Sequence, residues 1–176
     1  MIKKIKHAAI IGAAVLALHM PASATTFDSE ALDSFIGSAT ACIVGKVASI
    51  EYVTRSGLVF TKATVTVTDT AFGRTASEIS VLVPGGQVPN TKFPIAQIVA
   101  DAPILRSGQD LMLVLNSIPQ DTAYAVAGLS SGAINILDNG AGPQVALAGN
   151  QGLITLADAI EDIQAIRDGE NVIDAE

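Results

Sequence analysis

A glycine pair in the stretch Ser80–Asn90, SVLVPGGQVPN, is the first place where residue types and spacing suggest chemistry. Glycine-rich turns cradle phosphate groups when a helix begins directly behind them, usually with a lysine and a serine or threonine in the loop. Two prolines follow the pair and oppose an immediate helix, and the nearest lysine is Lys92. We therefore interpret Pro84, Gly85 and Gly86 as a structural turn, in which the proline ends a strand and the glycines permit positive φ.

Clustered carboxylates are the second group that could do chemistry, as acid and base or as cation ligands. Asp158, Glu161 and Asp162 lie close together near the C-terminus. Hydrolysis of a glycosidic bond requires two carboxyl groups that face each other across a cleft, so we expect a solvated helix face here. The DNG sequence that begins at Asp138 lacks the alternating acids and the distal glutamate of a calcium loop, so it predicts a hairpin turn.

The N-terminus has the three-part pattern of a secretory signal peptide. A basic segment, MIKKIKH, precedes the apolar run AAIIGAAVLAL, and an Ala-Ser-Ala cleavage site ends before Thr25. The apolar run is shorter than the roughly 20 residues that a membrane-spanning helix requires. We therefore predict cleavage of residues 1–24, no membrane span afterwards, and a periplasmic or secreted protein.

The predicted mature chain contains no histidine, because His7 and His19 both lie in the signal peptide. A chain without histidine has no Ser-His-Asp or Cys-His nucleophile and no histidine-ligated zinc or copper. None of its serines has the Ser-x-x-Lys spacing at the start of a helix. These absences argue against an enzyme, and we assign no catalytic, cofactor-binding or metal-binding residue and expect no cofactor.

Net charge limits the kinds of partner. The whole chain has a formal net charge of −7, and loss of the three signal-peptide lysines changes it to about −10. Nucleic-acid binding depends on basic residues that neutralise phosphates, so we expect no nucleic-acid partner. The same charge disfavours anionic membrane surfaces.

Cys42 is the only cysteine, so the chain forms no internal disulfide. Its neighbours in TACIVGKV are apolar. We interpret Cys42 as a buried small hydrophobic residue. An intermolecular disulfide and a free reactive thiol remain as alternatives.

Strand patterns occupy most of the mature chain. Residues 41–53 and 58–70 predict two long strands joined by a turn at 55–57, and Gly45 predicts a bulge in the first of them. Residues 79–83 and 111–116 predict further strands, and shorter ones flank Leu129–Gly132 and follow Pro143. Between them, residues 85–107 form an irregular excursion, whose apolar residues we expect to pin it to the body of the fold.

Helices are predicted at both ends of the mature chain. Residues 25–38 have apolar residues at helical spacing and acids near the start. Residues 156–168 form an amphipathic helix with Thr155 as N-cap and Gly169 as the C′ residue. We predict one mainly β domain over residues 25–176, an OB-like antiparallel barrel with a short N-terminal helix and a C-terminal amphipathic helix; an immunoglobulin-like sandwich is the alternative fold.

The strand motifs carry a resemblance. The segments IVGKVASIE, ISVLVPGGQV, GQDLMLVL and YAVAGLSSGAINI resemble a group of uncharacterised secreted bacterial proteins. That resemblance covers residues 31–137 and the C-terminal helix, and it implies a barrel like that of netrin and metalloproteinase-inhibitor modules. Such inhibitors bind the protease zinc through an N-terminal cysteine, whereas Cys42 lies well inside this chain. The resemblance therefore bears on the fold.

The resulting functional hypothesis is an exported, non-enzymatic binding protein that acts through its barrel loops on a protein or cell-surface partner. A small secreted hydrolase or protease-associated factor is one alternative. A structural subunit of an exported assembly is another, with the threonine-rich strand at 58–70 as the edge that a partner would extend.

Overall fold

The computed structural model describes residues 29–88, 92–93, 95–147 and 152–169. The predicted signal peptide, residues 1–24, lies outside this range. The described part is mainly β with two helices, as predicted. Within it, no helix combines the length and apolar character that a membrane crossing requires.

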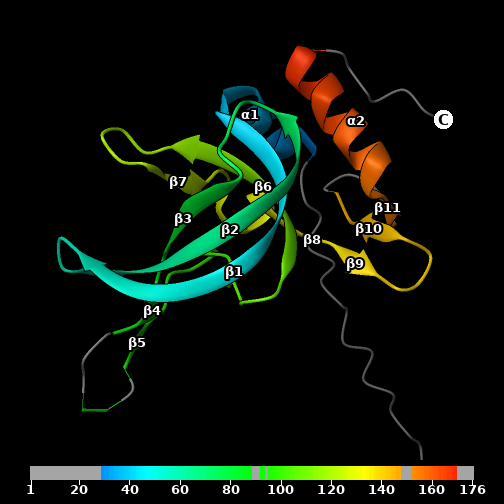
Figure 1. The fold of residues 1–176 in the computed structure, drawn as a ribbon. Helices are drawn as coiled ribbons and strands as arrows, with labels where there is room; N and C mark the ends of the chain where they lie inside the picture. The colour runs from blue at the N-terminus through cyan, green and yellow to red at the C-terminus, as the bar shows by residue number, and fades with distance from the viewer. Residues whose placement is uncertain (1–28, 89–91, 94, 148–151, 170–176) are drawn as a thin grey trace, which may run out of the picture.

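Five strands pair in a ring. The sheet order is β1-β2-β3-β7-β6-β8, and an additional pairing of β1 with β6 closes the ring (Figure 1). All of its pairings are antiparallel except that of β3 with β7, which is parallel. The strands are β1 (Ala41–Arg55), β2 (Leu58–Phe72), β3 (Glu78–Pro84), β6 (Asp110–Ser117), β7 (Ala123–Val126) and β8 (Ala133–Asn135).

Short elements complete the molecule. A 3-10 turn, η1, separates β7 from β8, and β9, β10 and β11 form a small sheet of their own beside the C-terminal helix (Figure 1). The excursion contains a two-residue pair of strands, β4 and β5, that sequence patterns did not reveal. The bounds are β4 (Gly86–Gln87), β5 (Ala96–Gln97), η1 (Leu129–Gly132), β9 (Leu137–Asp138), β10 (Pro143–Val145) and β11 (Ile154–Thr155).

Two apolar clusters hold the fold together, one on each face of the ring strands. In β6 the sequence LMLVL is buried throughout, and its residues alternate between the clusters. Leu111, Leu113 and Leu115 belong to one cluster, which contains side chains from all the ring strands and which we call the ring cluster. Met112 and Val114 belong to the other cluster, which also contains side chains of both helices and which we call the helix cluster. Burial on both faces explains why this strand is continuously apolar.

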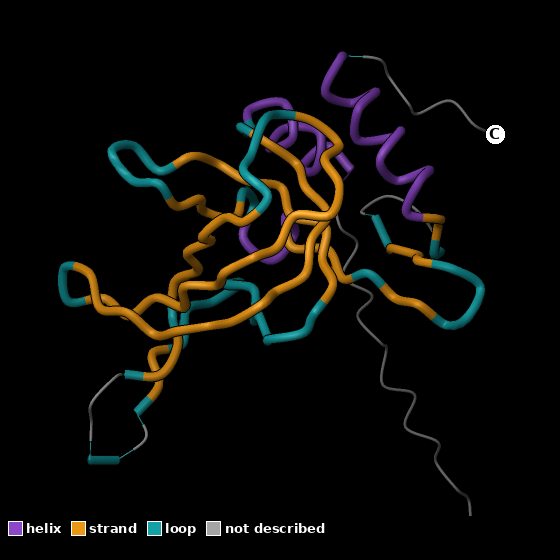
Figure 2. The backbone as a smooth tube through the Cα atoms, viewed as in Figure 1, coloured by secondary structure: helices purple, strands orange, loops and turns teal. Residues whose placement is uncertain are grey.

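The helices α1 (Ser29–Ser38) and α2 (Leu156–Asp168) cover the helix cluster and lie at the opposite end of the molecule from the excursion (Figure 2). Ala159 and Ile163 of α2 are fully buried in that cluster. Thr155 caps α2 by accepting a hydrogen bond from the Asp158 N–H at 3.2 Å, and Gly169 ends the helix in the left-handed region. The capping residues therefore act as the sequence predicted.

Strand β1 bends strongly because its register against β2 shifts at several points, one of them between Val44 and Gly45. A Cβ atom at Gly45 would lie 2.6 Å from the Thr66 carbonyl oxygen and 2.8 Å from Val65 Cγ1. Only glycine allows so close an approach. The predicted bulge at Gly45 is confirmed.

The assignment of residues 58–70 as a free sheet edge is wrong. Strand β2 pairs with β1 along its whole length and with β3 from Phe60 to Thr66. Its alternation of threonine with alanine and valine reflects one buried and one wetter face, which a strand shows at any position in a sheet. Alternation reveals which face is buried but not which edge is open.

Candidate functional site

The Pro-Gly-Gly corner joins β3 to the excursion and is fixed by hydrogen bonds to the end of β2. The Gly85 N–H donates to the Val59 carbonyl at 2.8 Å, and Thr61 Oγ1 donates to the Gly85 carbonyl at 2.9 Å. The Val59 N–H donates to Gln97 Oε1 at 3.0 Å, which ties the returning strand β5 to the same point. The excursion therefore leaves the body at the same place to which Gln97 returns.

Both glycines of the corner have positive φ, +96° at Gly85 and +133° at Gly86. A Cβ atom at Gly86 would lie 2.6 Å from Tyr52 Cδ1 and 2.7 Å from Thr61 Oγ1, and one at Gly85 would lie 2.9 Å from the Gln97 carbonyl oxygen. The pair is thus required for backbone conformation and for close packing. The element directly behind it is the strand β4, which begins at Gly86, and not the helix that a phosphate-binding turn requires.

The returning half of the excursion packs on the body of the fold. Leu105 is 4% exposed and belongs to the ring cluster, against which Ala102 also packs. The Asp101 carbonyl accepts a hydrogen bond from the Ser130 N–H at 2.8 Å, which connects this half to η1. The predicted pinning is confirmed for these residues.

The remaining apolar side chains of the excursion are exposed, so the expectation that they would pin it is wrong for them. Ile98 is 90% exposed and Ile104 is 74% exposed. We call this region the excursion surface; it consists of Phe93, Ile95, Ile98, Ile104 and, from the neighbouring hairpin, Leu58. Ile98 and Ile104 line the same hollow, and exposed large apolar side chains that lie together mark interaction sites more often than single exposed leucines do.

A hollow of about 250 Å³ lies beneath the excursion surface. Its wall includes the Tyr52 ring, the Pro-Gly-Gly corner and the segment from Ala102 to Leu105. Ile98 and Ile104 also line the hollow and belong to the excursion surface. The hollow is large enough for one or two apolar side chains of a partner and small for an ordinary small-molecule ligand.

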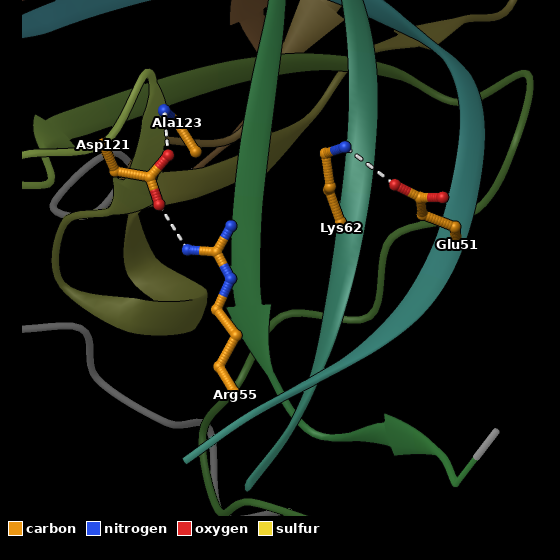
Figure 3. Close-up of polar contacts among 5 residues, drawn as sticks. All are labelled: Glu51, Arg55, Lys62, Asp121 and Ala123. Atoms are coloured by element: carbon orange, nitrogen blue, oxygen red, sulfur yellow. Dashed lines mark hydrogen bonds and ion pairs between the residues drawn. The ribbon is translucent and has the colours of Figure 1, made fainter.

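An ion pair connects the tip of the β1–β2 hairpin to the turn between β6 and β7. Arg55 donates to the Asp121 carboxylate, which also accepts a hydrogen bond from the Ala123 N–H at 3.1 Å (Figure 3). The hydrogen bond from Arg55, and after it the one from Ala123, lowers the pKa of Asp121 below its ordinary value. No sequence signal pointed to this pair, because its members are far apart in the chain.

Two larger hollows lie beside β8, of about 570 Å³ and 350 Å³. Gln109, Ser130, Ala133 and Asn135 line both, and Gln109 Nε2 donates to Asn135 Oδ1 at 2.6 Å between them. Their walls combine amides and hydroxyls with a few apolar side chains. Within the described residues, no three His, Cys, Asp or Glu side chains come together as a cation site in these hollows or elsewhere.

The structure places the other sequence candidates away from the excursion. Asp158 and Glu161 are exposed on α2, as expected of a solvated helix face, and Asp162 is half-buried. The DNG sequence forms the turn between β9 and β10, in which Asp138 Oδ1 accepts from the Gly140 N–H at 2.9 Å. Cys42 is fully buried in the helix cluster, and burial raises the pKa of its thiol to about 12. The reading of Cys42 as a buried hydrophobic residue is therefore confirmed, and a reactive thiol does not fit this position.

Comparison with protein-family models finds no match to this chain, and comparison with curated proteins finds none either. The features that distinguish this fold are the excursion surface, its fixed corner and the 250 Å³ hollow beside them.

Proposed function

We propose that this protein is an exported, non-enzymatic binding protein that contacts a protein partner through the excursion surface. The observation that carries this proposal is the exposure of Phe93, Ile95, Ile98 and Ile104 on one segment that is anchored at both ends. Apolar side chains in this setting lose contact with water when a partner covers them. Ile98 and Ile104 lie in the returning half, which is held to the body through Gln97, Asp101 and Leu105, so we expect a low entropic cost for ordering these two side chains.

The fold on which the excursion stands is an OB-like barrel in this proposal. The ring order β1-β2-β3-β7-β6, closed by β1 with β6 and with β3 parallel to β7, supports it. In small barrels of this type, loops at the ends of the strands provide the binding surface. The excursion occupies one such connection, between β3 and β6, and the ion pair of Arg55 with Asp121 ties two others together.

Binding would proceed by surface complementarity. A partner would insert an apolar side chain into the 250 Å³ hollow, against Tyr52 and the glycine corner, while Ile98 and Ile104 close around it. Such central apolar anchors supply most of the binding free energy in protein interfaces, and the surrounding contacts mainly exclude water.

Capture from a periplasmic or culture extract tests the proposal, with the chain that begins at Thr25 as bait. We expect wild type to retain a defined partner and Ile98→Asp to lose it, because a carboxylate would have to be desolvated at the centre of the interface. Leu153→Asp is the matched control, since Leu153 is 45% exposed and lies outside the excursion. Equal retention by wild type and Ile98→Asp, or none by wild type at near-native concentration, would contradict the proposal.

A further inference from the structure

The outer edge of β1 is open where the strand extends beyond the ring. Pairing with β6 ends at Lys46, and the backbone bonds of Val47 with the residues before β6 follow it. From Ser49 to Arg55, β1 pairs only with β2 among the residues that the structure describes. An unpaired strand edge is a template on which another strand can add.

The direction of the backbone groups on this edge follows from the partner strand. Thr54 lies opposite Val59 in the β1–β2 register. Both backbone groups of Val59 point away from β1, because its N–H donates to Gln97 Oε1 and its carbonyl accepts from the Gly85 N–H. Thr54 and Val59 are therefore a non-hydrogen-bonded pair, in which the N–H and C=O of Thr54 point to the open side.

Backbone direction alternates along a strand, so the N–H and C=O groups of Ile50 and Tyr52 also point to the open side. The edge sequence SIEYVTR contains no proline and no lysine, the residues with which proteins commonly block an exposed edge. It is rich in β-branched and aromatic residues, which favour strand pairing. Both the backbone and the side chains of this edge thus suit an added strand.

The charges of Glu51 and Arg55 limit which strand, in which register, can pair with this edge. We propose that β1 pairs with the same edge of a second copy of this chain, antiparallel about a two-fold axis at Val53. In this register Tyr52 lies opposite Thr54 of the other copy, so residues with outward backbone groups meet. Glu51 lies opposite Arg55 of the other copy, once on each side of the axis. A pairing centred on Glu51 or on Arg55 would instead place like charges opposite each other.

Glu51 and Arg55 already have oppositely charged partners within the chain, and with these partners the signs of charge would alternate across the dimer. Glu51 accepts a salt bridge from Lys62 of β2 at 2.7 Å, and Arg55 pairs with Asp121 (Figure 3). The side chains of Glu51 and Arg55 remain 60% and 43% exposed, so each can take a second partner. Across the dimer, positive and negative groups alternate from Lys62 to Glu51 and then to Arg55 and Asp121 of the other copy. Such networks contribute more than isolated surface pairs.

This self-association and the proposed function use different groups, since the dimer uses the backbone edge of β1, whereas partner binding uses the excursion surface and the hollow, to which Tyr52 contributes its side chain. The two can therefore fail separately. A dimer that forms in Ile98→Asp as it does in wild type would show that the excursion surface is not the dimer interface.

The test is sedimentation velocity of the mature chain over a wide range of concentration, for wild type and for two charge reversals. Wild type is expected to approach twice the monomer mass. Glu51→Arg and Arg55→Glu each create two like-charge contacts, so each is expected to weaken self-association by about a hundredfold. Each reversed side chain also meets a like charge within its own chain, Lys62 for Glu51→Arg and Asp121 for Arg55→Glu. An equal mixture of the two variants is nevertheless expected to dimerise again, because both charged contacts across the interface of the mixed dimer are complementary.

Two controls carry the same charge changes at exposed positions off the edge, Glu78→Arg and Arg74→Glu, and both should dimerise like wild type. Circular dichroism and thermal unfolding check that each variant is folded. The proposal is overturned if folded wild type stays monomeric at all concentrations, if the reversals dimerise like wild type, or if the mixture remains monomeric. Capture of a different protein by this edge, without self-association, would also overturn it.

Discussion

Replacing Gly86 by alanine is expected to destabilise the protein more than the same change at other glycines with positive φ. Gly86 has φ of +133°, and a Cβ atom there would lie 2.6 Å from Tyr52 Cδ1 and 2.7 Å from Thr61 Oγ1. Gly142 also has positive φ, +101°, but has nothing within 4 Å of the added atom. The two positions therefore share backbone strain and differ in packing.

The magnitude follows from these two terms. Backbone strain at a position that disfavours side chains costs about 1–3 kcal/mol. Overpacking against Tyr52 and Thr61 adds about 1–3 kcal/mol at Gly86 only. We therefore expect Gly86→Ala to lower the free energy of unfolding by about 2–6 kcal/mol and Gly142→Ala by about 1–3 kcal/mol. For a chain of this length, each kcal/mol corresponds to about 2–4 °C in Tm.

Urea unfolding followed by far-ultraviolet circular dichroism measures both variants, since the chain has no tryptophan to report by fluorescence. A double variant, Tyr52→Ala with Gly86→Ala, should lose less stability than the sum of the two single variants, because removal of the ring makes room for the methyl group. Equal destabilisation by Gly86→Ala and Gly142→Ala, with additive effects in the double variant, would refute the close-packing argument.

Three further predictions concern other parts of the structure. The raised pKa of Cys42 keeps its thiol protonated in the folded state while the thiol of the unfolded chain ionises. The free energy of unfolding should therefore fall between about pH 9 and about pH 12, by up to about 1.4 kcal/mol per pH unit. In Cys42→Ala, the free energy of unfolding should depend less on pH across this range. The lowered pKa of Asp121 stabilises the fold at pH values above the ordinary pKa of 3.8, and this contribution disappears as pH falls through the pKa of Asp121 in the folded protein. Below the ordinary pKa, Tm should therefore decline less steeply with falling pH in Asp121→Asn than in wild type. An unchanged slope would count against the ion pair of Arg55 with Asp121. Ile163→Ala removes a fully buried side chain and should lower the free energy of unfolding in urea by about 2–5 kcal/mol. Leu153→Ala, at an exposed site, should lower it by less than about 1 kcal/mol. Similar losses in the two variants would contradict the placement of α2 on the helix cluster.

Sequence patterns predicted those features that depend on neighbours in the chain. The turn predicted at 55–57, which the structure places at Ser56 and Gly57, follows from local residue types, as do the caps of α2 at Thr155 and Gly169 and the bulge at Gly45. The apolar run LMLVL predicted a strand, and burial on both of its faces explains why it is apolar throughout.

The remaining features depend on tertiary contacts that periodicity does not encode. Nothing in the sequence indicated that β3 would pair in parallel with β7, or that Arg55 would meet Asp121. Ile98 and Leu105 are both apolar residues of the excursion, yet one is exposed and the other buried, because only Leu105 reaches the ring cluster. The excursion surface could therefore be identified only from the structure, although the sequence indicated the start of the excursion at Pro84.

Contact between the two ends of the described chain has a consequence for the order of folding. Arg167 near the end of α2 donates to the carbonyls of Ile36 and Gly37 at the end of α1, and β1 pairs with β6 across a long stretch of sequence. Such distant contacts carry a large loop-closure entropy and slow folding. The β1–β2 hairpin can form early, as its turn is local. The helix cluster around Cys42 closes only when α2 has emerged, so a chain released without its last helix would fold with that cluster open to water.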